Sequence, residues 1–292
     1  MSQSPTPSAM PRTAPAGTVT MSSVTSLSGS MAATSSATRS ISSTRATVCS
    51  DRPASIRLAR VTGTRFPTPP GPTTTKTRVI ADNQHVVRID KESKDYIKES
   101  TEKKLFKFIE NQINELDGII LQDYNKGVLT ESLIKNVIDL ANKSKKLITV
   151  DPKFENFYCY KKATVFKPNR KEAEAKLGAK IFTAEEISIA GKKLMEQLKA
   201  KYLLLTLGEE GIAIFENGKP VERMETKARK VADVSGAGDT VISTLTIAMA
   251  AGADILEACY LANYAGGLVC EEVGIVPIEQ KKLFETVLKE HR

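Results

Sequence analysis

Short apolar runs alternate with helical segments along most of the chain, and this alternation constrains the fold more than any other feature. The runs are typical of buried parallel strands, which need helical crossovers to join them. The sequence therefore predicts an α/β fold, with a mainly parallel sheet sandwiched by helices. The expected strands are Gly118–Leu121, Leu147–Val150, Ala163–Phe166 and Lys201–Thr206. The expected helices are about Lys94–Leu116, Thr130–Ser144, Arg170–Leu177 and Ala184–Ala200.

Two hairpins and a helical C-terminal part complete the expected elements. Thr75–Ile80 and Val86–Ile89 are β-prone runs that predict one pair of strands. Ile212–Phe215 and Pro220–Glu225 flank Asn217-Gly218, a dipeptide that strongly favours a hairpin turn. The remaining helices are expected at Gly238–Ala251, Ile255–Glu271 and Ile278–Glu290.

The composition changes abruptly near residue 75. Residues 1–75 contain 30 Ser or Thr, seven Arg, no Lys and a single acid, Asp51. Such a segment cannot bury enough apolar surface to offset its ordering entropy, so disorder is the default expectation. We divide the chain into residues 1–72, which are low in complexity, and residues 73–292, a partial α/β domain. Two more specific interpretations of residues 1–72 are a transit peptide and a segment translated out of frame. The absence of family motifs described below favours the out-of-frame alternative.

Charge and cysteine usage argue against several functional classes. The net charge is +8, of which the first 75 residues contribute +6 (seven Arg less one Asp) and the remainder +2. The α/β part is therefore nearly neutral, and we expect no nucleic-acid partner. The four cysteines lack metal-site spacing and the chain has two His, so we expect no metal cluster. No apolar run reaches membrane-spanning length, which leads us to expect a cytoplasmic protein without a membrane partner.

A glycine-rich stretch, Ser235-Gly-Ala-Gly-Asp239, runs directly into an apolar helical pattern. Small residues at a helix start leave backbone N–H groups accessible, and with the helix dipole these form an anion site. An aspartate in the first turn is alternatively an ordinary N-terminal helix residue. The string alone therefore leaves a phosphate site and a plain helix start open.

The longer string Asp233-Val-Ser-Gly-Ala-Gly-Asp239 resembles the signature of the ribokinase (PfkB) family of sugar kinases. The resemblance implies a ribokinase-like fold with a small β lid, and ATP and Mg²⁺ as cofactors. It implies that Asp239 is the general base, which takes the proton from the acceptor hydroxyl. It also implies that the backbone of Gly236, Ala237 and Gly238 forms the anion hole. Both roles suit phosphoryl transfer, which depends on positioning and charge stabilisation.

Other strings resemble the nucleotide side of the same family. Asn169-Arg-Lys-Glu172 is similar to the Asn-x-x-Glu motif, whose glutamate organises magnesium-bound water, although a helix cap is the alternative. The turn with Thr206, Gly208 and Gly211 is similar to the family's glycine turn beneath ATP, or is a plain β-turn. The resemblance also implies that Asn263, in Leu261-Ala-Asn-Tyr-Ala265, lies beside the adenine, although an asparagine is common in helices.

Three polar residues follow the ends of expected strands, where open α/β sheets hold their ligands. Asp123 and Lys126, in Gln122-Asp-Tyr-Asn-Lys-Gly127, are candidate contacts to the substrate. Lys153, in Val150-Asp-Pro-Lys153, is a candidate contact to the cofactor phosphates. Exposed loop lysines are alternatively just solvated.

Four strings narrow the resemblance, which are Pro72–Ile80, Asn83–Glu92, Asp123–Gly127 and Val150–Lys153. They look like the branch that phosphorylates D-glycero-β-D-manno-heptose 7-phosphate, a lipopolysaccharide precursor, at its anomeric hydroxyl. The resemblance covers nearly all of residues 72–292. The chain has no His-x-Gly-His nucleotidyl-transfer motif, so a single activity is expected. The alternatives are another sugar or sugar-phosphate kinase of the family, or an impaired nucleotide-binding remnant. The hairpin within 75–89 resembles lid strands that pair subunits, which implies a homodimer.

The family's N-terminal motifs are missing from residues 1–71. These motifs are a Gly-Asp start and a Gly-Gly-x-x-x-Asn stretch that shapes the sugar site, and nothing in this segment matches them. Without that half, the sheet lacks strands and the sugar pocket lacks most of its floor. We therefore expect the chain to fold poorly and to have little or no kinase activity, while its ATP half persists.

Overall fold

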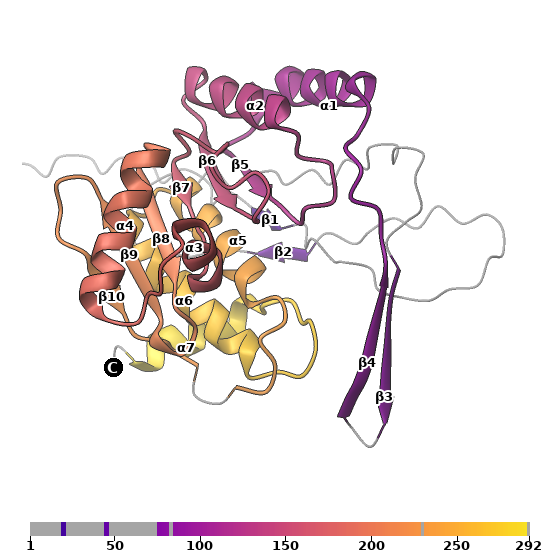
Figure 1. Cartoon of the computed structure of the whole chain (residues 1–292). Coiled ribbons are helices and arrows are strands. Elements are labelled where there is room, and N and C mark those ends of the chain that lie inside the picture. Colours follow the sequence, from indigo (N-terminus) through magenta and orange to yellow (C-terminus); the bar gives the residue numbers. More distant parts are fainter. Residues whose placement is uncertain (1–18, 22–43, 47–74, 82–83, 229–230, 291–292) are drawn as a thin grey trace, which may run out of the picture.

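The computed structural model describes residues 19–21, 44–46, 75–81, 84–228 and 231–290. Its main sheet has six strands in the order β10-β9-β8-β7-β6-β5 (Figure 1). The first four strands in sequence run parallel, while β9 and β10 are antiparallel additions, which confirms the predicted mainly parallel α/β sheet. The strands are β5 (Gly118–Gln122), β6 (Leu147–Asp151), β7 (Val165–Phe166), β8 (Tyr202–Thr206), β9 (Ile212–Glu216) and β10 (Glu222–Met224).

Helices cover both faces of this sheet. Strand β8 shows why, because its side chains alternate between two separate apolar cores. Leu203 and Leu205 belong to a core shared with helices α2 and α4, whereas Tyr202 and Leu204 belong to a core shared with α5 and α6. The helices are α1 (Glu99–Gln112), α2 (Glu131–Lys143), α3 (Arg170–Leu177), α4 (Ala184–Leu198), α5 (Ala237–Ala250), α6 (Ile255–Cys270) and α7 (Gln280–Glu290), with short 3-10 turns at Ile113–Glu115 and Gly208–Glu210.

The starts of the helices follow from local capping chemistry. Helices α3, α4 and α6 each begin with a capping box, in which the N-cap and N3 side chains bond each other's backbone N–H. Helix α1 is shorter than the expected Lys94–Leu116. Its start is delayed because Ser93 and Asp95 bond each other locally, and the Ile97 N–H donates to the Gly127 carbonyl. The segment before Glu99 is thereby held outside the helix.

Strands β3 (Thr75–Ala81) and β4 (Gln84–Lys91) form the predicted hairpin. In Figure 1 this ribbon extends away from the remainder of the described chain. Its turn, residues 82–83, lies outside the described residues.

Two further strands, β1 (Val19–Met21) and β2 (Thr44–Ala46), pair antiparallel in the first segment. The remainder of residues 1–72, to which the predictions of disorder and of an out-of-frame origin apply, lies outside the described residues. Among the helices that are described, none is both long and apolar enough to cross a membrane.

Candidate active site

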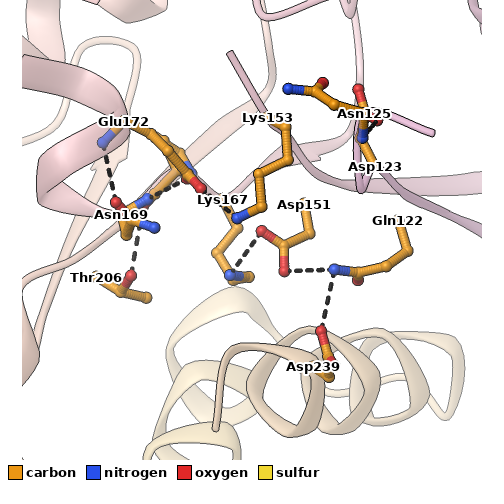
Figure 2. A network of polar contacts seen from close by, with 11 residues as sticks. Gln122, Asp123, Asn125, Asp151, Lys153, Lys167, Asn169, Glu172, Thr206 and Asp239 are labelled. Atoms are coloured by element: carbon orange, nitrogen blue, oxygen red, sulfur yellow. Dashed lines mark hydrogen bonds and ion pairs between the residues drawn. The ribbon is translucent and has the colours of Figure 1, made fainter. Parts of the chain in front are cut away.

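The carboxyl ends of β5, β6 and β7 meet the first turn of α5 in one polar network (Figure 2). Gln122 ends β5 and lies in register with Asp151, which ends β6. Lys167 follows β7 directly, and Asp239 lies in the first turn of α5. Because the carboxyl ends of parallel strands share one edge of the sheet, side chains distant in sequence converge there.

The carboxylate of Asp239 is held by two donors. Gln122 Nε2 donates to its Oδ1 over 3.1 Å, and the Tyr124 hydroxyl donates to its Oδ2 over 3.0 Å. Partial burial raises the pKa of the Asp239 carboxyl above its ordinary value. The Tyr124 hydrogen bond acts in the opposite direction, as do Lys167 and Lys153, whereas the like charge of Asp151 adds to the rise. Asp239 remains accessible to solvent, so it can meet a ligand.

A buried ion pair lies beneath this carboxylate. Lys167 Nζ is 3.0 Å from Asp151 Oδ1, and both residues are about as buried as the apolar core. A Cβ added at Gly238 would lie 3.6 Å from Lys167 Nζ, so the glycine-rich helix start packs directly on the pair. Sequence reasoning missed Gln122, Tyr124, Asp151 and Lys167 as site residues. The strand-end rule that selected Lys153 could have found them.

The start of α5 is fixed by its N-cap glycine and by the loop that precedes it. Gly236, its N-cap, has φ +84°, a conformation that favours glycine. Asp233 supports the preceding loop by accepting from the N–H groups of Ser235 (2.9 Å) and Gly274 (3.2 Å). Further along α5, the Thr246 hydroxyl pairs with that of Thr149 in β6 at 2.7 Å. The first-turn N–H groups of a helix have no intrahelical partner and can bind an anion. The structure places Gly236, Ala237 and Gly238, the predicted anion hole, beside Asp239, and the Ala237 N–H there donates to the Val234 carbonyl over 3.3 Å.

Glu172 and Lys153 form a second polar centre at the same edge. Asn169 Oδ1 accepts from the Glu172 N–H, and Glu172 Oε2 accepts from the Asn169 N–H, each over 2.9 Å. The other oxygen of Glu172, a residue only 2 % exposed, accepts from Lys153 Nζ at 2.5 Å. Burial alone would lower the pKa of Lys153, but the hydrogen bond and charge of Glu172, together with the charges of Asp151 and Asp239, raise this pKa above its ordinary value. Glu172 therefore belongs both to the capping box of α3 and to the ion pair with Lys153.

The turn after β8 depends on glycine backbone. Thr206 donates its N–H to the Pro168 carbonyl, and the Leu207 N–H donates to the Gly211 carbonyl. Gly208 and Gly211 have φ values of +66° and +82°. A Cβ at Gly211 would lie 2.0 Å from the Met224 carbonyl oxygen, because β10 passes directly against it.

Gly211→Ala should therefore destabilise the fold by about 2–5 kcal/mol, through backbone strain together with a clash that no side-chain movement relieves. The shift of the urea midpoint measures this effect. Gly218→Ala is the matched control, since Gly218 also has positive φ (+77°) but nothing lies within 4 Å of its added Cβ. Its cost should be about 1–2 kcal/mol. Equal costs at the two positions would contradict the close approach of β10.

Three of the candidate residues are bonded elsewhere in the chain. Asp123 is buried and accepts from the Tyr160 hydroxyl and the Asn125 N–H, each over 2.7 Å. Lys126 forms an ion pair with Glu92. Asn263 is buried in α6 and donates to the Glu225 carbonyl over 2.7 Å. The structure thus brings Asp239, Lys153, Asn169 and Glu172 together at the carboxyl edge of the main sheet. Asp123, Lys126 and Asn263 instead bond to neighbouring parts of the chain.

Comparison with known proteins is consistent with this geometry. A model of the family described as pfkB family carbohydrate kinase matches residues 61–281. The relatives include "Bifunctional protein HldE" of Desulfatibacillum aliphaticivorans, 44 % identical over 211 residues, which are 72 % of this chain and 43 % of that protein. The protein of the same name from Helicobacter pylori strain J99 is 45 % identical over 202 residues, 69 % of this chain and 43 % of its own. The chain therefore spans less than half the length of these relatives.

Solved structures show the same fold. Phosphofructokinase-2 from Escherichia coli, in complex with potassium, superposes with a TM-score of 0.62 at 17 % identity, over 75 % of this chain and 71 % of that one. Ribokinase from Arabidopsis thaliana, complexed with ribose and ATP, gives 0.60 at 22 % identity, over 75 % and 70 %. The predicted ribokinase-like fold and the predicted family are both confirmed. The chain belongs to the pfkB family of carbohydrate kinases.

Proposed function

We propose that the site of this chain is built to transfer the γ-phosphoryl group of ATP to the anomeric hydroxyl of D-glycero-β-D-manno-heptose 7-phosphate, at a rate that the missing N-terminal motifs keep low. The observation that carries the proposal is the placement of Asp239, a solvent-accessible carboxylate in the first turn of α5, next to the backbone of Gly236–Gly238. A base beside an anion site is the minimum that phosphoryl transfer requires. The extended match to the relatives named HldE favours a heptose phosphate over other sugars.

The reaction assigns each group a task. The sugar O–H bond breaks and its proton passes to Asp239, while the sugar oxygen forms a bond to the γ-phosphorus. The bond between that phosphorus and the bridging oxygen breaks, and its electron pair leaves with ADP. The N–H groups at the start of α5 stabilise the charge on the transferring group. The ion pair of Lys167 and Asp151 lies beside Gly238, with Lys167 Nζ and Asp151 Oδ2 at 3.6 and 3.7 Å from an added Cβ, so it supports the helix start without bringing net charge to it.

The remaining candidates divide between the two substrates. We assign Asn169, Glu172, Lys153, the turn of Thr206, Gly208 and Gly211, and Asn263 to the nucleotide side. Asp123 and Lys126 are assigned to the sugar side. Asp123 is bonded to Tyr160 and Lys126 to Glu92, so both support the shape of the loop after β5.

Mg²⁺ is the metal that this donor set fits. The described residues contain no group of three or more His, Cys, Asp or Glu that could cage a metal ion. Mg²⁺ keeps several waters and binds through one or two carboxylates together with substrate phosphates. The buried carboxylate of Glu172, held in place by its capping box, is suited to orient such waters. When bound, the ion would neutralise charge on the phosphates of ATP.

The test combines transfer with binding. The purified chain is incubated with Mg²⁺, γ-labelled ATP and a panel of heptose 7-phosphate, fructose 1-phosphate and tagatose 6-phosphate, and ATP affinity is measured by calorimetry. Labelled heptose bisphosphate formed in preference to the other products supports the proposal. Preference for another sugar moves it to a different kinase of the family. ATP binding without transfer to any sugar would establish the nucleotide-binding remnant instead.

We further propose a cytoplasmic homodimer that pairs through the β3–β4 hairpin. In the register of the ribbon, Thr77 is opposite Ile89, and Val87 lies two residues before Ile89 in β4, so these three residues share one face. Val87 and Ile89 are 47 % and 58 % exposed. A hairpin this isolated is marginal by itself in water, and a second copy would cover its apolar face.

A further inference from the structure

Gln122 donates hydrogen bonds to two carboxylates at once. Its Nε2 is 2.8 Å from Asp151 Oδ2 and 3.1 Å from Asp239 Oδ1. Both partners are acceptors when ionised, so the NH₂ end of the amide, with its two N–H groups, must be the end that faces them. A single side chain thus joins the buried Asp151–Lys167 pair to the carboxylate at the start of α5 (Figure 2).

The alternation of the strand explains why Gln122 and Tyr124 act on the same carboxylate. Side chains two residues apart lie on the same side of an extended chain. The ladder continues past β5, because the Asp123 N–H donates to the Asp151 carbonyl over 3.0 Å. Gln122 and Tyr124 therefore both face α5, whereas Asp123 points to the opposite side, toward Tyr160.

We propose that Gln122 is a positioning residue for Asp239, with Tyr124 as its second arm. The inference rests on the proposed function, in which Asp239 is the base. Each arm holds one carboxylate oxygen, and every carboxylate oxygen has a further lone pair available for the acceptor hydroxyl. The Asp151–Lys167 pair cannot move without disturbing the packed core, so it anchors Gln122 and, through it, the orientation of the base.

The proposal also predicts how the base titrates. Four titratable or charged groups face Asp239 from the sheet edge. They are Tyr124, which follows β5, Asp151, which ends β6, Lys153, which follows β6, and Lys167, which follows β7. A hydrogen bond donated to the ionised carboxylate favours that form and lowers the pKa. Removing either arm should therefore raise the pKa of Asp239 further. Because the base works only when deprotonated, activity is lost as pH falls through this pKa, and the variants should lose it at a higher pH than the wild type.

The experiment uses Gln122→Met and Tyr124→Phe in the full chain. The titration of the Asp239 carboxyl is followed by side-chain ¹³C NMR, assigned by its loss in Asp239→Asn, and the acid limb of kcat/KM is recorded alongside it. Both midpoints should move to higher pH, and kcat of Gln122→Met should fall by on the order of 10- to 100-fold with little change in the KM for ATP. Gln197→Met, on the exposed side of α4, and Tyr158→Phe, whose hydroxyl donates to the Lys176 carbonyl, are the matched controls. They should titrate and turn over like the wild type.

An Asp239 titration that is unchanged in both variants would overturn the positioning role, even if the kinase is active. The NMR readout needs no turnover, so a chain without kinase activity but with displaced titrations would refute the proposed function and leave the contact intact. Tyr124 is half exposed, so Tyr124→Phe is expected to fold even if Gln122→Met does not. Circular dichroism distinguishes these cases.

Discussion

Asp239→Asn should lower phosphoryl transfer by about 10²- to 10⁴-fold, the usual contribution of a positioned general base, while ATP still binds. The substitution keeps the shape of the side chain but removes the carboxylate that we propose takes the proton. It also replaces one acceptor oxygen by an NH₂ group, so Gln122 and Tyr124 can no longer both donate to it. The label-transfer assay measures the rate, and calorimetry measures the affinity for ATP.

The stability of this variant should change by no more than about 1 kcal/mol, since the side chain is accessible to solvent. Partial burial already disfavours the ionised form of Asp239, and a neutral amide avoids that cost. Asp254→Asn is the matched control, because Asp254 is the N-cap of α6 and asparagine caps helices equally well. Its turnover should equal that of the wild type. A loss of ATP binding in Asp239→Asn, or equal losses of rate in both variants, would remove Asp239 from the role of base.

Most of the fold could be predicted from the sequence because its signals are local. Helix α3 has the expected bounds, since Asn169 and Glu172 form a capping box that fixes its start and Gly178 ends it with positive φ. The parallel strands were found because they are buried on both faces and so appear as continuous apolar runs. The bounds were less accurate where a distant partner decides them, as at α1, whose start depends on Ile97 bonding to Gly127.

The site was harder to predict, because it depends on which side of a strand each residue faces. Asp123 was selected by its charge at a strand end, yet the alternation turns it toward Tyr160 and turns its uncharged neighbour Gln122 toward Asp239. A shift of one residue reverses the side on which a strand residue points. Lys167 was not selected, although it follows a strand as Lys153 does, because nothing in the local sequence shows that its side chain is buried. Its burial arises from α5, a helix that begins 70 residues later.

That buried lysine leads to the second large effect. Lys167→Met should destabilise the protein by about 3–5 kcal/mol, because it leaves Asp151 charged and buried without its cation. Asp151→Asn should cost a similar amount by leaving Lys167 unpaired. The change in the urea midpoint, at constant slope, measures each cost.

The double variant measures the interaction between Lys167 and Asp151 apart from the contacts that each residue makes with its surroundings. Removing both charges removes the uncompensated charge as well, so Asp151→Asn combined with Lys167→Met should cost less than the sum of the single variants by about 1–3 kcal/mol. Lys135→Met is the control, since Lys135 forms an exposed pair with Asp139 within α2 and should cost no more than about 0.5 kcal/mol. Strict additivity of the two buried substitutions would mean that Lys167 and Asp151 are stabilised independently. In that case the anchor of Gln122 would be the carboxylate of Asp151 alone.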